Sequence, residues 1–339
     1  MTEPGFSKPA RETPPSAHER PSTKILRSAL GALTAARVDF ALRKPPAAGE
    51  LDLDVERRSA AAVETVLAGA GFVKFRARGQ RGHRFYLSCQ EGEWAKVDVK
   101  LAAPWPDLPV PQRVAGGLGR VLAALATHVP LGLRRSGPVV AFLGPDGAGK
   151  GTVIDAVRAT IPVASHVCYL GSKGVGGSAI PARARRRLPL RVREPLFVLK
   201  KLLGAGRILG HAYARAWCGS IVLCDRHPLE ALATRPRITA AARRLEHALL
   251  LRVLPTPDLI VVLDAPTEIL LARKPEHPEA VIERWRAGYR DAFASFEETT
   301  FCSTDRSLDA VAATVREQIW NALLVRREPA RSSLSRGSR

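Results

Sequence analysis

The sequence has 339 residues, 46% of them hydrophobic, which is long enough for two domains with packed cores. Its 52 lysines and arginines outnumber 32 acidic residues, and the net charge of +20 favours phosphorylated ligands, nucleic acid or anionic membrane surfaces as partners. The five cysteines form no CxxC pair, which argues against a zinc site or a disulfide framework. No apolar run is typical of a signal core or a membrane span, so we expect a cytoplasmic protein.

The N-terminal part begins with a segment rich in proline, serine and charge, residues 1–22, which we expect to be disordered. Thr23 is the expected N-cap of a helix, because the apolar residues after it recur on one helical face. These residues are Ile25, Leu26, Leu30 and Leu33. Residues 38–42 and 49–55 then predict two strands.

Three aspartates are distinctive in this part of the chain. Asp52 and Asp54 lie two residues apart in the second strand, so both project to the same side of it. A helix and two strands follow, and the last strand carries Asp98. We expect these elements at residues 60–70, 83–88 and 94–101.

This arrangement of helices, strands and three acids resembles nucleotidyltransferase-like domains over residues 23–105. The resemblance implies that Asp52, Asp54 and Asp98 hold Mg²⁺, which activates a nucleophile and steadies a nucleoside triphosphate. Active members of that family carry a Gly-Ser pair ahead of the acids, where residues 43–46 of this chain are Arg-Lys-Pro-Pro. An active transferase and a catalytically silent domain both stay open, and we favour the silent one.

A proline-rich stretch follows and indicates a linker with one helix at residues 112–126 and a domain boundary near residue 135. The expected divisions are a disordered tail at 1–22, a smaller α+β domain at 23–105, a linker at 106–135, a larger domain at 136–325 and a disordered tail at 326–339.

Residues 144–152 read Gly-Pro-Asp-Gly-Ala-Gly-Lys-Gly-Thr and lie between an apolar run at 138–143 and a helical pattern at 153–161. A strand, a glycine loop and a helix in this order form a phosphate-binding loop. The glycines let successive N–H groups point inward, the helix N-terminus adds positive charge, and the lysine reaches the β- and γ-phosphates. We expect an ATP site formed by Gly144, Asp146, Gly147, Ala148, Gly149, Lys150, Gly151 and Thr152.

The segment at residues 183–215 combines ten lysines and arginines with one acid, Glu194, and interleaved apolar residues. Pro195 suits a helix start. This pattern predicts a basic amphipathic helix. A lid over phosphates, a solvated surface helix, an anionic membrane contact and a nucleic-acid contact all stay open for it.

Continuous apolar runs separated by helices predict a parallel sheet covered on both faces. After the run that precedes the glycine loop, these strands are expected at residues 165–170, 221–224, 259–264 and 301–302, with a closing helix at 308–324. Ligands of such sheets lie beyond the carboxyl ends of the strands. Gly144, Asp225 and Asp264 follow or end such strands, so we expect them to border one crevice.

The glycine loop, the strand ending in Asp-Arg-His at 225–227, the segment at 257–274 and the Glu-Arg-Trp-Arg helix at 283–286 resemble the thymidylate kinase family of P-loop phosphotransferases over residues 136–325. The resemblance implies that Lys150 holds ATP phosphates and that Asp225 orients Mg²⁺, with Thr152 beside it. It also implies the following roles: acceptor contacts for Asp146 and Arg226, lid cations at Arg273 and Lys274, and a structural role for Asp264.

Two departures concern acceptor recognition, because the segments at 165–177 and 228–237 lack the family's TREPGG-like and base-recognising residues. The sequence therefore predicts an α/β kinase that uses ATP and Mg²⁺ to phosphorylate a nucleotide or another phosphorylated acceptor, with dTMP among the candidates. A nucleotidyltransferase regulated by its P-loop half and a non-catalytic ATP-dependent adaptor are the alternatives. Further partners that stay open are an anionic membrane surface, through residues 183–215, and a second copy in a homodimer.

Overall fold

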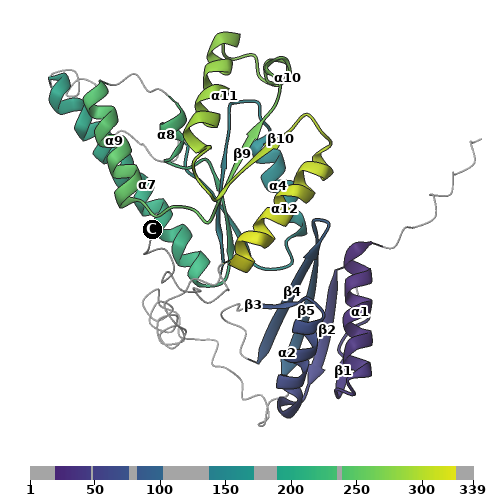
Figure 1. The fold of residues 1–339 in the computed structure, drawn as a ribbon. Helices are drawn as coiled ribbons and strands as arrows, with labels where there is room; N and C mark the ends of the chain where they lie inside the picture. The colour runs from purple at the N-terminus through teal and green to yellow at the C-terminus, as the bar shows by residue number, and fades with distance from the viewer. Residues whose placement is uncertain are drawn as a thin grey trace, which may run out of the picture.

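A computed structural model describes residues 20–46, 49–75, 82–101, 137–171, 189–234 and 239–325 of the chain (Figure 1). The linker predicted at 106–135, the boundary near 135, the C-terminal tail and most of the N-terminal tail lie outside the described residues. No helix in the described part combines the length and apolarity needed to cross a bilayer.

The N-terminal elements form a five-stranded sheet in the order β1-β2-β5-β4-β3, in which only β2 and β5 are parallel neighbours. The elements are α1 (Pro21–Ala35), β1 (Phe40–Leu42), β2 (Glu50–Val55), the short 3-10 helix η1 (Arg57–Ser59), α2 (Ala60–Gly69), β3 (Val73–Phe75), β4 (His83–Gln90) and β5 (Glu93–Leu101).

Two N-terminal predictions need correction. The first helix starts at Pro21 rather than after Thr23, because a proline is well suited to the first helical position and needs no N–H there. The predicted tail therefore ends before residue 21. Strand β3 was not predicted, because its three residues are too few to show a period-two pattern.

Alternation along the strands gives this sheet two different faces. Leu51, Leu53 and Val97 are buried against α1 and α2, in a core that contains Leu26 and Leu33. Residues between them on β2 and β5 project to the opposite face, which carries the three aspartates.

The C-terminal elements form a second five-stranded sheet in the order β10-β9-β6-β8-β7, with every neighbouring pair parallel. Its elements are β6 (Val139–Leu143), α4 (Lys150–Thr160), β7 (Ser165–Tyr169), α7 (Leu190–Trp217), β8 (Ile221–Asp225), α8 (Glu230–Ala233), α9 (Ala240–Val253), β9 (Leu259–Asp264), α10 (Thr267–Arg273), α11 (Glu279–Phe293), β10 (Thr299–Ser303) and α12 (Leu308–Val325).

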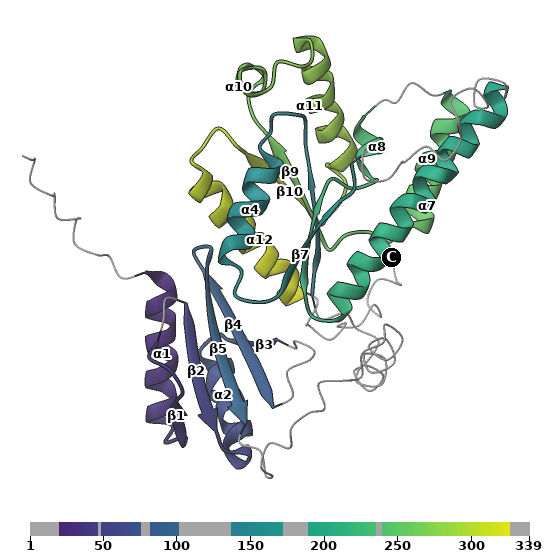
Figure 2. The same ribbon diagram turned by 180° about the vertical axis from the view of Figure 1, so that it is seen from behind.

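Helices cover both faces of the parallel sheet, as predicted (Figures 1 and 2). Helices α4 and α12 pack on one face through a core that includes Phe142, Leu223 and Val261. Helices α7, α8, α9 and α11 contribute to cores on the other face, around Leu143 and Val222. Strand β6 lies in the middle of the sheet, so the glycine loop after it emerges at the centre of the carboxyl edge.

Helix α7 does not start at Pro195 as predicted; it starts at Leu190 and contains Pro195 in its second turn. A proline there removes one backbone hydrogen bond of the helix. The helix nevertheless extends over 28 residues in all, because a buried stripe packs it against the sheet. Members of this stripe include Val198, Leu202, Ala205, Leu209, Ala212 and Ala216.

The two sheets meet at α12, the yellow helix between them in Figure 1. The rings of Trp94 and Trp320 pack edge to face with centroids 5.5 Å apart. The Arg316 guanidinium donates to the carbonyl of Gly92, whose φ of +72° and close approach to Ala313 leave no room for a side chain. Because α12 also packs on α4, it links the N-terminal sheet to the helix that follows the glycine loop.

Candidate active site

The glycine loop makes a tight turn between β6 and α4. Gly144, Gly147 and Gly149 have φ values of +137°, +88° and +75°, a region that glycine enters with little strain. A Cβ at Gly144 would lie 2.1 Å from the carbonyl oxygen of Leu263. The backbone therefore turns directly against the end of β9, and α4 begins at Lys150.

Lys150 is buried within this turn, with a side chain that is 8% exposed. Its ammonium donates to the carbonyls of Gly144 at 2.7 Å and Pro145 at 2.8 Å. Burial, assisted by the positive charge of Arg226, lowers the pKa of Lys150 to about 8, although nearby acids oppose this shift. The amine of Lys150 thus loses its proton at a lower pH than an exposed lysine does.

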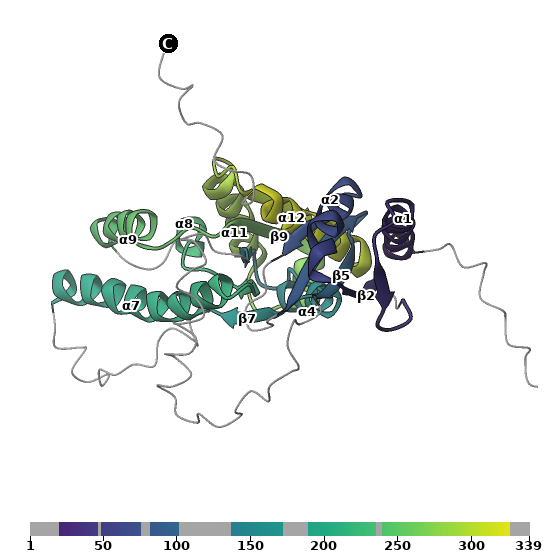
Figure 3. The same ribbon diagram turned by 90° about the horizontal axis from the view of Figure 1, so that it is seen from below.

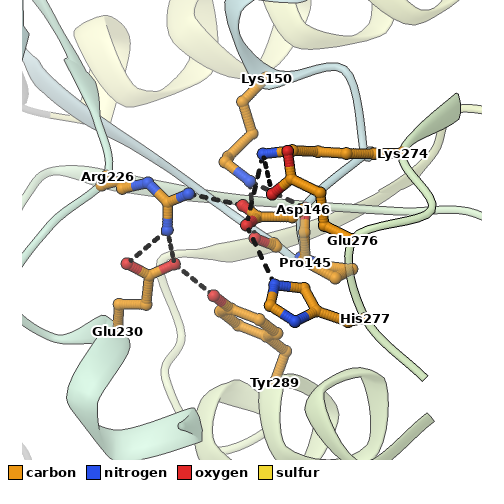
Figure 4. Close-up of polar contacts among 10 residues, drawn as sticks. Pro145, Asp146, Lys150, Arg226, Glu230, Lys274, Glu276, His277 and Tyr289 are labelled. Atoms are coloured by element: carbon orange, nitrogen blue, oxygen red, sulfur yellow. Dashed lines mark hydrogen bonds and ion pairs between the residues drawn. The ribbon is translucent and has the colours of Figure 1, made fainter. Parts of the chain in front are cut away.

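Arg226 and Asp146 form the centre of the site (Figure 4). Arg226 directly follows β8 with a φ of +70° and donates to Asp146 at 2.6 Å and to Glu230 at 3.0 Å. Burial alone would lower the pKa of Arg226, but these two carboxylates outweigh it and raise the pKa. Burial would likewise raise the pKa of Asp146, and Arg226 outweighs that effect and lowers it. Both groups are therefore held in their charged forms.

Glu230 and Tyr289 belong to the same network but were given no role by the sequence. The Tyr289 hydroxyl donates to Glu230, which ties α11 to the residue that holds Arg226. Burial, reinforced by Glu230, raises the pKa of Tyr289 and keeps its hydroxyl protonated. The sequence held one signal for the Arg226–Glu230 ion pair, which is that Glu230 follows Arg226 by four residues.

Residues after α10 border the other side of Asp146. The Lys274 ammonium lies 3.6 Å from the Asp146 carboxylate and 3.2 Å from Glu276. The His277 ring lies 3.9 Å from Asp146 and packs edge to face on Trp285. Asp146, Glu276 and His277 each have one possible metal-ligand atom, and these atoms lie within 4.8 Å of one another. The Lys274 ammonium already pairs with both carboxylates of this group.

Arg273 is a predicted site residue that forms its hydrogen bonds outside this network. Its guanidinium donates to the hydroxyl of Thr304 at 3.1 Å and to the carbonyl of Thr304 at 2.7 Å. These contacts tie the end of α10 to the segment after β10. Between the two predicted lid cations, only Lys274 has a contact to Asp146.

Asp225 and Thr152 are the predicted Mg²⁺ residues. Asp225 ends β8, which pairs with the strand that leads into the loop, and Thr152 lies exposed in the first turn of α4. Burial raises the pKa of Asp225, with Glu230 and Asp146 adding to the effect against Lys150 and Arg226. A carboxylate and a hydroxyl are oxygen donors that fit Mg²⁺, which retains waters and substrate phosphates as its other ligands.

Asp264, for which a structural role is expected, joins β9 to α11 through hydrogen bonds. It accepts from Arg286 at 2.8 and 3.1 Å and from Arg290 at 2.9 Å. These bonds fasten the end of β9 to α11, the helix that carries Tyr289.

The three N-terminal aspartates share one sheet face, with Asp52 and Asp98 directly paired across β2 and β5. Protein cations already face them. Lys44 lies 3.4 Å from Asp52, and Arg43 lies 3.4 Å from Asp54 and 3.7 Å from Asp98. The residues ahead of the acids thus place protein cations beside all three carboxylates, and the Mg²⁺ site predicted at these acids stays a prediction.

No protein-family profile matches the chain. The chain is 32% identical over 211 residues to the hemin import ATP-binding protein HmuV of Streptomyces coelicolor, and the match covers 56% of this chain and 74% of that protein. Similar solved structures include a deoxyadenosine kinase from M. mycoides, with 12% identity, a TM-score of 0.39 and coverage of 54% of this chain and 98% of that chain. They also include the thymidylate kinase from Candida albicans, with 15% identity, a TM-score of 0.40 and coverage of 55% and 92%.

Proposed function

The chain belongs to the P-loop nucleoside triphosphatases, and we propose that it is an ATP-dependent kinase. It transfers the γ-phosphoryl group of ATP to a nucleotide or another phosphorylated acceptor, and dTMP is one candidate. Asp225 and Thr152 are the residues proposed to hold Mg²⁺, which when bound neutralises charge on the phosphates.

The observation that carries this proposal is the arrangement of cations around Asp146. Lys150 lies in the loop, Arg226 contacts Asp146 from the end of β8, and Lys274 approaches the same carboxylate from the segment after α10. Hydrolysis and transfer both need cations around the donor phosphates and the moving group, but transfer to a phosphorylated acceptor also needs a cation that binds the acceptor phosphate. Arg226 can provide that additional cation, and Lys274 the charge beside the moving group.

Each residue then has a physical task. Lys150 and the loop amides bind the β- and γ-phosphates of ATP. Arg226 binds the acceptor phosphate through its planar guanidinium, and Asp146 accepts from an acceptor hydroxyl. Lys274 neutralises charge on the moving phosphoryl group, and Arg273 supports the segment that presents it.

A second candidate is an ATPase that needs no acceptor, and the identity to the hemin import ATP-binding protein favours it. Incubation of the purified protein with ATP, Mg²⁺ and a panel of nucleoside monophosphates and sugar phosphates separates the two functions. We expect ADP release that depends on one acceptor class, with a product that is heavier by one phosphate. ADP release at the same rate without any acceptor would establish the ATPase, and ATP binding without turnover would establish the adaptor.

Arg226→Ala should raise the acceptor KM by about 10- to 150-fold, because a charged bidentate contact contributes about 1.5–3 kcal/mol. The KM for ATP should change much less. Steady-state kinetics with each substrate varied in turn measures both constants, and Arg284→Ala, an exposed arginine on α11, is the matched control. An effect confined to ATP would mean that Arg226 binds the donor.

The low pKa of Lys150 predicts a pH dependence for ATP capture. The value of kcat/KM for ATP should fall as pH rises through about 8, because the free enzyme then loses the ammonium charge. The kcat should fall less, because bound phosphates keep the amine protonated. The free energy of unfolding should change in the opposite direction. Between a pH of about 8 and 10.5 the unfolded lysine, with its ordinary pKa of 10.5, still binds a proton that the folded protein has released. The free energy of unfolding therefore rises with pH over this range. Lys150→Met should lose both pH dependences, so the difference between it and the wild type measures the contribution of the amine. A kcat/KM for ATP that does not change with pH in the wild type would contradict the prediction.

We also propose that the surface of α7 has a partner other than the nucleotide. The sequence left an anionic membrane surface and a second copy of the chain as candidates, and the side chains on this helix distinguish them.

A further inference from the structure

Helix α7 exposes large apolar side chains on the side away from its buried stripe. Leu199 is 49% exposed and Leu203 is 67% exposed, and Leu196, at 45%, extends this surface by one turn. Exposed apolar side chains that are contiguous on one surface mark an interaction site more often than scattered ones do.

A groove between α7 and α9 continues this apolar surface, with a volume of about 440 Å³. Its lining includes Leu199, Leu203, Gly206 and Gly210 of α7 and Leu249 and Val253 of α9. Val253 is 66% exposed, and a Cβ built on either glycine would contact nothing, so the groove is shallow and open. Both helices extend away from the N-terminal sheet (Figure 3), and the bond from Lys201 to Glu246 fixes them to each other.

The charges on these helices have one predominant sign. Arg207 lines the groove and is exposed, and Arg244 and Arg252 are exposed on α9. Among the described side chains of α7 and α9 there are two acids, and both are engaged: Glu194 accepts from Thr239, and the buried Glu246 accepts from Lys201. The cationic rim of the groove thus consists of Arg207, which lines it, and Arg252, which directly precedes the lining residue Val253 in the sequence.

We propose that the α7–α9 groove binds an anionic membrane surface, which names the partner proposed above and does not depend on the phosphoryl acceptor. Leu199, Leu203 and Val253 enter the boundary between headgroups and acyl chains, and Arg207 and Arg252 contact the lipid phosphates. The apolar surface is complementary to the acyl chains, and the cationic rim is complementary to the anionic headgroups. In this proposal the two helices lie on the bilayer surface and do not cross it.

A second copy of the chain fits this groove less well. In a two-fold symmetric contact the same surface of both copies meets, so Arg207 and Arg252 would face a partner surface with the same excess of positive charge. The same charges attract an anionic bilayer by about 1 kcal/mol per basic residue near its surface.

Co-sedimentation with vesicles, in the absence of nucleotide, tests the proposal. We expect the full chain to bind phosphatidylcholine vesicles that contain phosphatidylserine at least about tenfold more tightly than vesicles of phosphatidylcholine alone. Leu199→Gln combined with Leu203→Gln should weaken binding by more than about tenfold, whereas Leu308→Gln, which changes a leucine of 41% exposure on α12, should not. Arg207→Gln with Arg252→Gln should weaken binding and its salt dependence relative to Arg284→Gln.

Three results would overturn the proposal: equal binding to both kinds of vesicle, no binding to either, and binding that the double leucine variant leaves unchanged. A fourth such result would come from light scattering, which measures the oligomeric state. If the wild type is a dimer and the double leucine variant is a monomer, the groove binds a second copy of the chain. Because kinase activity is assayed separately and without lipid, failure here leaves the proposed phosphotransferase intact.

Discussion

We expect Lys150→Ala to abolish phosphoryl transfer in a protein that stays folded. In the proposed kinase the ammonium binds the ATP phosphates, and its position inside the glycine turn shields it from solvent. Removal of one preorganised charge-stabilising donor reduces kcat by about 10²- to 10³-fold in comparable cases, and this lysine also aligns the donor. We therefore expect a loss of at least about 10³-fold.

Stability should change little, because burial already disfavours the charged amine, as its low pKa shows. Lys150→Met is the matched variant, since it keeps the apolar stem and removes only the charge. Single-turnover assays of both variants, with circular dichroism and thermal unfolding beside them, make the test. Turnover like that of the wild type in a well-folded Lys150→Met protein would disprove the kinase mechanism.

The parallel sheet and the glycine loop were predictable from the sequence for a local reason. Strands buried on both faces show as continuous apolar runs, and the loop needs glycine at the positions where φ is positive. Both signals lie within a few residues. The ends of the helices were less predictable, because Pro21 and Pro195 are compatible with more than one position in a first turn.

Contacts between distant segments were not predictable. The pairing of Glu230 with Tyr289, and the orientation of Arg273 towards Thr304 rather than towards Asp146, depend on how α8, α10 and α11 pack. The packing of Trp94 on Trp320 joins residues more than two hundred positions apart, and no periodicity in either segment indicates it. Propensity and spacing are local signals, whereas these contacts are set by tertiary packing.

Arg43 and Lys44 explain in physical terms why we propose that the N-terminal acids are catalytically silent. Three carboxylates on one face repel one another unless cations lie among them. In nucleotidyltransferases Mg²⁺ has this role; here Arg43 lies between Asp54 and Asp98, and Lys44 faces Asp52. Prolines at 45 and 46 also lack the backbone N–H groups that would bind a triphosphate.

Arg43→Ala should therefore lower the free energy of unfolding by about 1–2 kcal/mol, because it removes the cation beside Asp54, whose side chain is 47% exposed, and leaves buried Asp98 with its contact to His83. Arg58→Ala is the matched control; that arginine pairs with Glu56 but is 76% exposed, so its loss should have little effect. Addition of Mg²⁺ without nucleotide should restore part of the stability of Arg43→Ala, and a further Asp98→Asn substitution should remove that rescue. Urea unfolding with and without Mg²⁺ measures each case.

If Mg²⁺ stabilises the wild type as strongly as Arg43→Ala, the acids form an open metal site. The Asp52→Asn, Asp54→Asn double variant should then lose a nucleotidyl transfer activity that Lys150→Ala retains, and the N-terminal domain would be the primary enzyme.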